Sequence, residues 1–323
     1  MNNKTLFSQD KKFLELWKSY TKGIKEILHM RYVPHYWYIL SDYCLFDKNK
    51  PSPTATFTLC PLASPSDIAN HLSRKKFKDL KQMTNVPDEV LKTIRDDKYF
   101  FTISFVIEKN YLTVSDEDFL KIQENLKTYI KNNTSVPENQ SAGISLKKLI
   151  EYLKQKSFNK KLVKNFILIS SIVSHFIEFL AIKNNAKSVY WVSDRGALNN
   201  LAEGVIFHYV NIKQCFLLKG RANPVKMSYA VEDENNNFQF DGLISYPDII
   251  TGTISSFNLE TKQLDKNKHL ELLINSLAGN PRFMLIHLKN DHTATSYTLT
   301  PKISNNEIYR VNSNKISHPG TST

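Results

Sequence analysis

The chain has 323 residues, of which 41% are hydrophobic, and its formal net charge is +12 at pH 7. A chain of this size and apolar content can bury a core without disulfide or metal staples, and we expect one decorated domain. Cys44, Cys60 and Cys215 form no CxxC pair, which excludes a disulfide framework and a zinc knuckle and suits a reducing cytoplasm.

The N-terminal residues mix charges with apolar positions, which excludes a signal peptide. The longest apolar stretch, residues 166–182, contains His175 and Glu178 and is therefore interpreted as a buried helix of a soluble protein. The positive charge favours contact with nucleic-acid phosphates, but a Lys-, Asn- and Ile-rich composition from an AT-rich genome would produce the same charge. Both explanations stay open.

Hydrophobic periodicity and turn residues predict alternating elements along the chain. In the first half we expect a helix over 9–30, strands over 36–46 and 54–60, a broken helical region over 64–97, a strand over 99–108 and a helix over 113–131. In the second half we expect a loop over 131–143, a helix over 161–183, a strand over 188–194, a helix over 198–209, a strand over 214–220, helices from 245 and over 268–277, a strand over 282–289 and a polar tail.

This order is typical of the ribonuclease H-like fold, in which three antiparallel strands precede parallel strands joined by helical crossovers. We therefore expect an α/β protein with a ribonuclease H-like mixed sheet over 31–260, in which the first and fourth strands are neighbours. Helical insertions are predicted near 64–98 and 113–160. An N-terminal helix over 1–30 and a helix–strand extension with a polar tail over 261–323 complete the expected organisation.

Acidic residues stand at unusual places in these elements. Asp42 interrupts an apolar strand and Asp194 ends another, and a carboxylate in a central strand is costly unless it is paired or binds a cation. On adjacent strands, about 4.8 Å apart, the two carboxylates could share a divalent ion. Such sites hydrolyse phosphodiesters with two ions about 4 Å apart, and all-oxygen ligands select Mg²⁺ or Mn²⁺.

Two further acidic residues complete the predicted metal site. Asp248 shares a helix face with Gly252 and Ser255, beside an apolar stripe formed by Ile249, Ile250, Thr253, Ile254 and Phe257. The alternative for Asp248 is a first-turn residue that stabilises a helix N-terminus. Glu178 follows Ser171 and Ser174 along a polar helical stripe, and it could instead be an ordinary exposed residue, with Glu151 or Asp241 in its place.

The segments VSDRGALNN, with Asp194, and PDIITGTI, with Asp248, follow Asp42 in an order that resembles the domain-of-unknown-function 3800 family of presumed ribonuclease H-like nucleases. The family's first motif continues Asp-Glu-Ser-Gly, whereas this chain reads SDYCLF. The resemblance covers residues 33–258 and implies a nuclease whose metal is held by Asp42, Asp194 and Asp248.

Basic residues follow the predicted strand at 214–220. Lys219, Arg221 and Lys226 could hold substrate phosphates, and a solvated loop explains them equally well. His35, His175 and His208 share no metal-ligand spacing and are interpreted as structural or surface histidines.

The sequence thus predicts a cytoplasmic metal-dependent nuclease that acts on DNA or RNA. Its predicted catalytic residues are Asp42, Asp194, Asp248 and Glu178, which would hold Mg²⁺ or Mn²⁺. Fold analogy extends the expectation to a toxin or antiviral-defence role. Two alternatives remain: a non-catalytic ribonuclease H-like module that binds nucleic acid or protein, and an unrelated α/β interaction protein. Divalent-metal binding distinguishes them from the enzyme.

Overall fold

The structure is a computed structural model. It describes residues 35–62, 77–97, 99–111, 114–133, 140–193, 196–202, 204–230, 240–264, 266–290, 294–301 and 309–315. The chain divides into two compact units. We call them the helical unit, Met1–Thr21, Leu112–Lys187 and Arg195–Met227, and the sheet unit, Lys22–Tyr111, Ser188–Asp194 and Ser228–Thr323.

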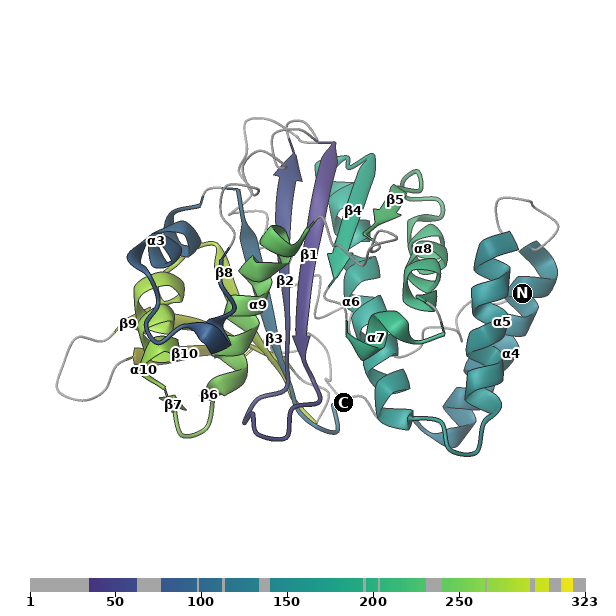
Figure 1. Cartoon of the computed structure of the whole chain (residues 1–323). Coiled ribbons are helices and arrows are strands. Elements are labelled where there is room, and N and C mark those ends of the chain that lie inside the picture. The colour runs from purple at the N-terminus through teal and green to yellow at the C-terminus, as the bar shows by residue number, and fades with distance from the viewer. Residues whose placement is uncertain are drawn as a thin grey trace, which may run out of the picture. The chain divides into compact units, whose positions relative to one another are not determined.

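The sheet unit is built on a mixed eight-stranded sheet with the order β10-β9-β8-β3-β2-β1-β4-β5 (Figure 1). β1, β2 and β3 pair antiparallel, while β1 is parallel to β4 and β3 is parallel to β8. The expected α/β class, the antiparallel hairpin and the adjacency of the first and fourth strands are therefore confirmed. The strands are β1 (Tyr36–Cys44), β2 (Thr54–Leu62), β3 (Phe101–Ile107), β4 (Ser188–Ser193), β5 (Lys226–Tyr229), β8 (Phe283–Leu288), β9 (Ala294–Pro301) and β10 (Tyr309–Lys315), with a separate pair β6 (Phe257–Asn258) and β7 (Gln263–Leu264).

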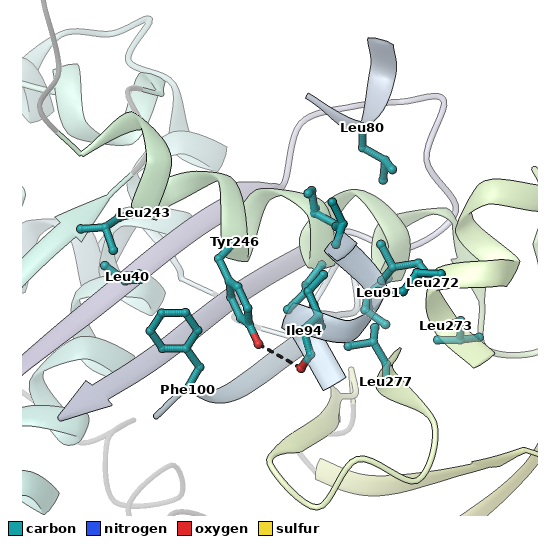
Figure 2. Packing of buried hydrophobic residues seen from close by; sticks show 14 of the residues in the cluster. Leu40, Leu80, Leu91, Ile94, Phe100, Leu243, Tyr246, Leu272, Leu273 and Leu277 are labelled. Carbon is teal, nitrogen blue, oxygen red and sulfur yellow. Dashed lines mark hydrogen bonds between the residues drawn. The ribbon is translucent and has the colours of Figure 1, made fainter. Parts of the chain in front are cut away.

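Helix α9 packs on β1 and β2 through an apolar face (Figure 1). The predicted stripe is confirmed, because Ile249, Ile250, Thr253, Ile254 and Phe257 are all fully buried. Figure 2 shows this cluster, in which Leu243 and Tyr246 of α9 lie near Leu40 of β1 and Phe100. Burial of one α9 face against the sheet leaves the opposite face available to a site. The helical elements of this unit are η1 (Leu80–Gln82), α3 (Asp88–Asp96), α9 (Asp241–Ser256), α10 (Asn267–Leu272) and the π-helical turn η3 (Leu273–Leu277).

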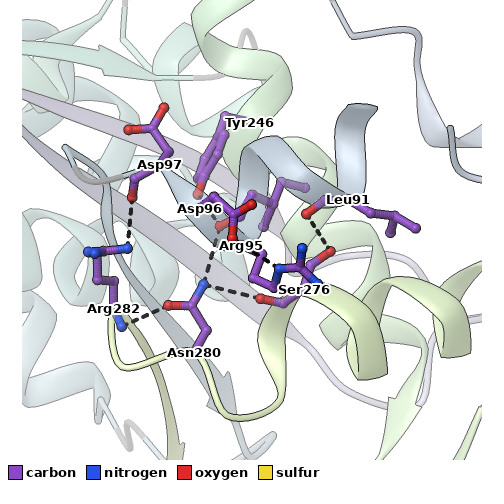
Figure 3. A network of polar contacts seen from close by, with 9 residues as sticks. Leu91, Arg95, Asp96, Asp97, Tyr246, Ser276, Asn280 and Arg282 are labelled. Carbon is purple, nitrogen blue, oxygen red and sulfur yellow. Dashed lines mark hydrogen bonds and ion pairs between the residues drawn. The ribbon is translucent and has the colours of Figure 1, made fainter. Parts of the chain in front are cut away.

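Hydrogen bonds to the carboxyl end of α3 hold three elements together (Figure 3). The Tyr246 hydroxyl of α9 and the Asn280 amide both donate to the carbonyl of Ile94, over 3.3 and 3.2 Å. Ser276 Oγ of η3 donates to the carbonyl of Leu91 over 2.9 Å. The last four carbonyls of a helix have no partner within the helix, so the bonds to Ile94 satisfy one of them and fix α3 to α9, and the Leu91 bond adds a contact to η3.

The helical unit consists of α4 (Asp116–Asn133), α5 (Gln140–Lys154), α6 (Lys160–Asn184), α7 (Ala197–Asn200) and α8 (Val205–Leu218). Helix α6 begins where the Asn159 side chain accepts a hydrogen bond from the amide of Leu162, and it ends at Asn185, whose φ is 49°. Within the described residues, α6 alone is long and apolar enough to cross a membrane, and 83% of its most apolar window is buried. That burial is typical of a core helix and is consistent with a soluble protein.

Two sequence predictions between residues 198 and 220 are wrong. Residues 214–220 were expected as a strand, but residues up to Leu218 belong to α8, and the strand β5 lies later, at Lys226–Tyr229. A short apolar run such as CFLL does not distinguish a strand from a buried helix. The helix expected over 198–209 is divided between α7 and α8 at Gly204, whose φ is 79°.

The remaining corrections concern polar segments. Residues 140–154 form α5 although part of this segment was expected in a loop, and the expected polar tail contains β9 and β10. The N-terminal helix predicted over 9–30 lies outside the described residues, as do positions 134–139 of the predicted loop.

Candidate functional site

A pocket of about 480 Å³ opens in the sheet unit, between the end of β1, the turn that follows it, α9 and the start of α10. Its lining includes Asp42 and Asp248, which the sequence singled out, together with Gly252 and Ser255 of the predicted small-residue face. The structure therefore brings together two of the four predicted metal ligands. All residues that line this pocket belong to the sheet unit.

Asp42 is placed by strand alternation. Tyr38 and Leu40 belong to the core under α9, so Asp42, the next residue in the same alternation, points to that side of β1. Asp42 is 7% exposed, and its register partner on β2 is Thr56. Thr56 Oγ1 in turn lies 2.9 Å from Ser104 Oγ of β3. A polar path thus crosses three strands beside the Asp42 carboxylate.

Asp248 lies in the interior of α9, well after the helix begins at Asp241. The alternative that it stabilises a helix N-terminus is therefore wrong, because the helix dipole acts within the first turn. Asp248, Gly252 and Ser255 are spaced along the pocket-facing side of α9. A Cβ atom at Gly252 would lie 3.4 Å from Leu80 Cδ2, so the glycine keeps this face free of bulk.

The strand before Asp194 lies beside Asp42. Ser193, the last residue of β4, is in register with Ser41 of β1 in a parallel pair. Trp191 Nε1 donates to Ser41 Oγ over 2.9 Å. Val192 points to the other face of the sheet and packs in the apolar cluster with Leu40, because successive residues of a strand alternate between faces. Asp194 itself lies outside the described residues.

Glu178 belongs to the helical unit, where both of its oxygens are engaged. His175 Nδ1 lies 2.9 Å from Oε2, and Arg221 Nη1 donates to Oε1. Burial alone would raise the pKa of Glu178, but His175 and Arg221 outweigh it and the pKa lies below its usual value. Its side chain is only 4% exposed, so the alternative of an exposed residue is wrong. The two substitutes differ in setting: Glu151 pairs with Lys154 on α5, and Asp241 begins α9.

Lys219, Arg221 and Lys226 are all exposed. Arg221 pairs with Glu178, so its guanidinium has a structural partner as well as a solvent-facing side. The phosphate-binding role of these residues stays a prediction.

The sequence analysis missed four lysines that line the pocket, Lys50, Lys81, Lys266 and Lys268, which we call the pocket lysines. Lys50 Nζ donates to Ser256 Oγ, and Lys268 Nζ donates to the carbonyls of Leu80 and Met83 over 2.6 and 2.7 Å. These lysines come from three separate stretches of the chain, so no local pattern could have indicated them.

His269 also lines the pocket and is 4% exposed. Burial and the nearby charges of Lys50, Lys268 and Lys266 lower its pKa to about 4. The imidazole is therefore neutral at neutral pH. Thr253 Oγ1 lies 3.5 Å from its Nδ1.

Within the described part of the chain, no group of three or more His, Cys, Asp and Glu side chains is placed to hold a metal ion. Asp42 and Asp248 offer two carboxylates to one pocket, an oxygen donor set that fits a hard cation. Comparison with models of known protein families finds no match, and comparison with curated proteins finds none either.

Proposed function

We propose that the chain is a metal-dependent nuclease of ribonuclease H-like fold, which hydrolyses phosphodiester bonds at the pocket between β1 and α9. The observation that carries the proposal is that Asp42 and Asp248, far apart in the sequence, line the same pocket. Asp194, the residue after β4, is proposed as the third ligand.

The strand order supports the fold in this proposal. Within the sheet, β3-β2-β1-β4-β5 has the first three strands antiparallel and β4 parallel to β1, which is the order expected for a ribonuclease H-like core. β8, β9 and β10 extend this core beyond β3. They are the additional strands that a decorated member of the fold would carry.

The residues present suit Mg²⁺ or Mn²⁺, because carboxylate oxygens are the ligands of hard cations. Two such ions supply activation of water and stabilisation of the leaving oxygen. Asp42 would hold an ion from a rigid central strand, and Asp248 would do so from a helix fixed by the apolar core and the α3 hydrogen bonds. Rigid placement matters because a catalytic group that shifts by about 1 Å loses much of its effect.

Glu178 stays a prediction as the fourth ligand. Because His175 and Arg221 engage both of its oxygens, a metal would have to displace one of these partners. Its role therefore needs a test of its own.

The test measures cleavage of a panel of single- and double-stranded DNA and RNA in Mg²⁺ or Mn²⁺. We expect Asp42→Asn to reduce cleavage by at least about 100-fold, since loss of a ligand removes transition-state stabilisation. Asp194→Asn should do the same, and Asp248→Asn should cost less. Asp96→Asn, an exposed change on α3, is the matched control and should cleave normally.

Mn²⁺ binding, followed by electron paramagnetic resonance, gives a second readout. The wild-type protein should bind Mn²⁺ and Asp42→Asn should bind it more weakly. A wild-type protein that cleaves no substrate in the panel and binds no Mn²⁺ would overturn the proposal.

A second candidate is a non-catalytic module of the same fold that binds nucleic acid or a protein. The net charge of +12 favours it. It predicts metal-independent nucleic-acid binding without cleavage, so the same panel distinguishes the two.

A further inference from the structure

We propose that the pocket lysines form a phosphate-binding subsite, which holds a substrate phosphate next to the one that is cleaved. This inference rests on the nuclease proposal and adds to it the group by which the substrate is positioned. It is carried by the placement of four lysines in one pocket, none of which forms a direct ion pair with a carboxylate of the described residues.

Elsewhere in the described structure, four lysines form ion pairs with carboxylates. Lys121 pairs with Glu117, Lys127 with Glu124, Lys154 with Glu151 and Lys160 with Asp116, all within 2.7 Å. Such exposed pairs form easily wherever a carboxylate is within reach.

The pocket is different. Neither Lys50, Lys81, Lys266 nor Lys268 forms an ion pair with a carboxylate of the described residues. Two aspartates of the same pocket use an oxygen for backbone amides instead: Asp47 accepts from Asn49 N over 2.9 Å, and Asp79 accepts from Lys81 N over 2.8 Å. Burial lowers the pKa of Lys50, the Lys266 and Lys81 charges lower it further and Asp47 raises it, so the lysines repel one another although aspartates line the same pocket. A bound anion would relieve that repulsion.

Two of these ammonium groups are held in place before any ligand arrives. Lys268 Nζ donates to two carbonyls, and Lys50 Nζ donates to Ser256 Oγ with the Gly252 carbonyl 3.4 Å away. Because the positions are already fixed, little conformational entropy remains to be lost on binding. Lys266 and Lys81 are exposed at the pocket wall and add charge without such bonds.

His269 shows that the field of these lysines reaches the buried wall of the pocket. Burial, together with Lys50, Lys268 and Lys266, keeps its imidazole neutral. A neutral imidazole can still donate one hydrogen bond to an oxyanion. An anion bound among the lysines would weaken the field, so His269 serves as a reporter of occupancy.

A phosphate group fits these features better than a carboxylate. Its oxygens can accept from several separate ammonium groups, and lysine binds phosphate as a point charge. The pocket volume of about 480 Å³ lies within the usual range for small-molecule sites, large enough for a nucleotide unit. Asp42 and Asp248 share the pocket, which would put the bound phosphate close to the proposed metal ions.

The test uses the full chain without divalent metal, so that binding is separated from cleavage. Lys81→Ala with Lys266→Ala removes two exposed pocket charges, and Lys92→Ala with Lys109→Ala is the control with the same loss of charge outside the pocket lining. The probe is inorganic phosphate, and its binding is followed through the NMR signals of the His269 imidazole. These signals are assigned by their loss in the His269→Gln variant.

With the wild type and the control pair, phosphate should shift the His269 signals and raise its pKa from about 4. With the pocket pair, the phosphate affinity should fall by at least about fivefold, since each lost lysine removes a direct charge contact. Equal phosphate affinity in the two pairs, or no response of His269 in the wild type, would overturn the subsite.

Oligonucleotides with and without a 5′-phosphate, measured in EDTA, separate the two sources of the phosphate. Equal binding of both would assign the subsite to an internal phosphodiester, and tighter binding of the phosphorylated strand would assign it to a terminal phosphate. A protein that binds phosphate through these lysines but cleaves nothing would retain the subsite and lose the nuclease. If the Lys81→Ala, Lys266→Ala variant cleaves normally and binds phosphate as the wild type does, the nuclease proposal would be retained and the subsite would be lost.

Discussion

Charged side chains are treated in opposite ways in the two units of this chain. In the helical unit, Glu178 is buried and both of its oxygens are engaged by His175 and Arg221. In the sheet unit, the pocket collects four lysines that form no direct ion pair with a described carboxylate, although Asp42, Asp47, Asp79 and Asp248 line the same pocket. A buried charge that is fully satisfied is best explained by the stability of its surroundings. Charges of both signs that gather in an open pocket without direct ion pairs are better explained by a ligand.

The difference between the two units is tested most directly by substituting one acidic residue in each unit. Glu178→Ala should lower the free energy of unfolding by about 3 kcal/mol, because it leaves Arg221 and His175 without their buried partner. Asp42→Asn should change it by less than about 1 kcal/mol in metal-free protein, because a site residue serves the ligand more than the fold. Urea denaturation of the metal-free proteins measures both.

Glu151→Ala is the control for the first substitution, since its pair with Lys154 is exposed and should contribute at most about 0.5 kcal/mol. A Glu178→Ala protein as stable as the wild type but inactive would make Glu178 a metal ligand. An Asp42→Asn protein that loses several kcal/mol would make Asp42 structural.

A second prediction concerns pH, and it sharpens the contrast within the pocket. The pKa of His269 is lowered to about 4 in the folded chain, against an unfolded value of about 6.5. Between pH 4 and pH 6.5, His269 therefore binds a proton more readily in the unfolded chain than in the folded chain. The contribution of neutral His269 to the free energy of unfolding is present above pH 6.5 and decreases as the pH falls toward 4.

Between pH 7 and pH 5 we expect a loss of about 2 kcal/mol that His269→Gln removes. Glu178 contributes in the same direction at lower pH. Its pKa is depressed, so its stabilisation is present above the unfolded value of about 4.3 and is lost as the pH falls through the folded pKa. Urea denaturation at both pH values measures the effect. An identical pH dependence in the His269→Gln protein would show that neither burial nor the lysine charges lower the pKa of this histidine.

Much of the sheet could be predicted from the sequence because its strands are apolar and bounded by turn residues. β1, β2, β3, β4 and β8 all lie within or close to the expected ranges. The wrong predictions fall on segments whose composition is not typical of the element that they form. α5 follows a polar stretch rich in Asn and Ser, β9 is polar, and α8 is apolar on all sides, so none of them shows a clear period.

The site was predictable only in part, for a related reason. Asp42 was recognisable because a carboxylate in an apolar strand needs an explanation, and Asp248 because small residues share its helix face. The pocket lysines gave no signal, since an exposed lysine looks ordinary until the fold gathers several around one pocket. Glu178 was predicted as a metal ligand, and that role stays a prediction. Its contact with Arg221 could not be predicted, because helical periodicity gives no information about contacts with other segments.

The smallest expected effect tests whether the pocket face of α9 must stay bare. Gly252→Ala adds a methyl group that would lie 3.4 Å from Leu80 Cδ2, an ordinary contact, and it removes a glycine from a helix interior. We therefore expect the metal-free protein to gain about 0.5 to 1 kcal/mol of stability. Cleavage should nevertheless fall several-fold, because the methyl group adds bulk to the pocket-lining face of α9 that also carries Asp248. Ser245→Ala on the same helix does not alter the pocket lining and should leave cleavage unchanged. Higher stability with unchanged cleavage in Gly252→Ala would mean that the substrate does not approach this face of α9, and the catalytic assignment of Asp248 would fail with it.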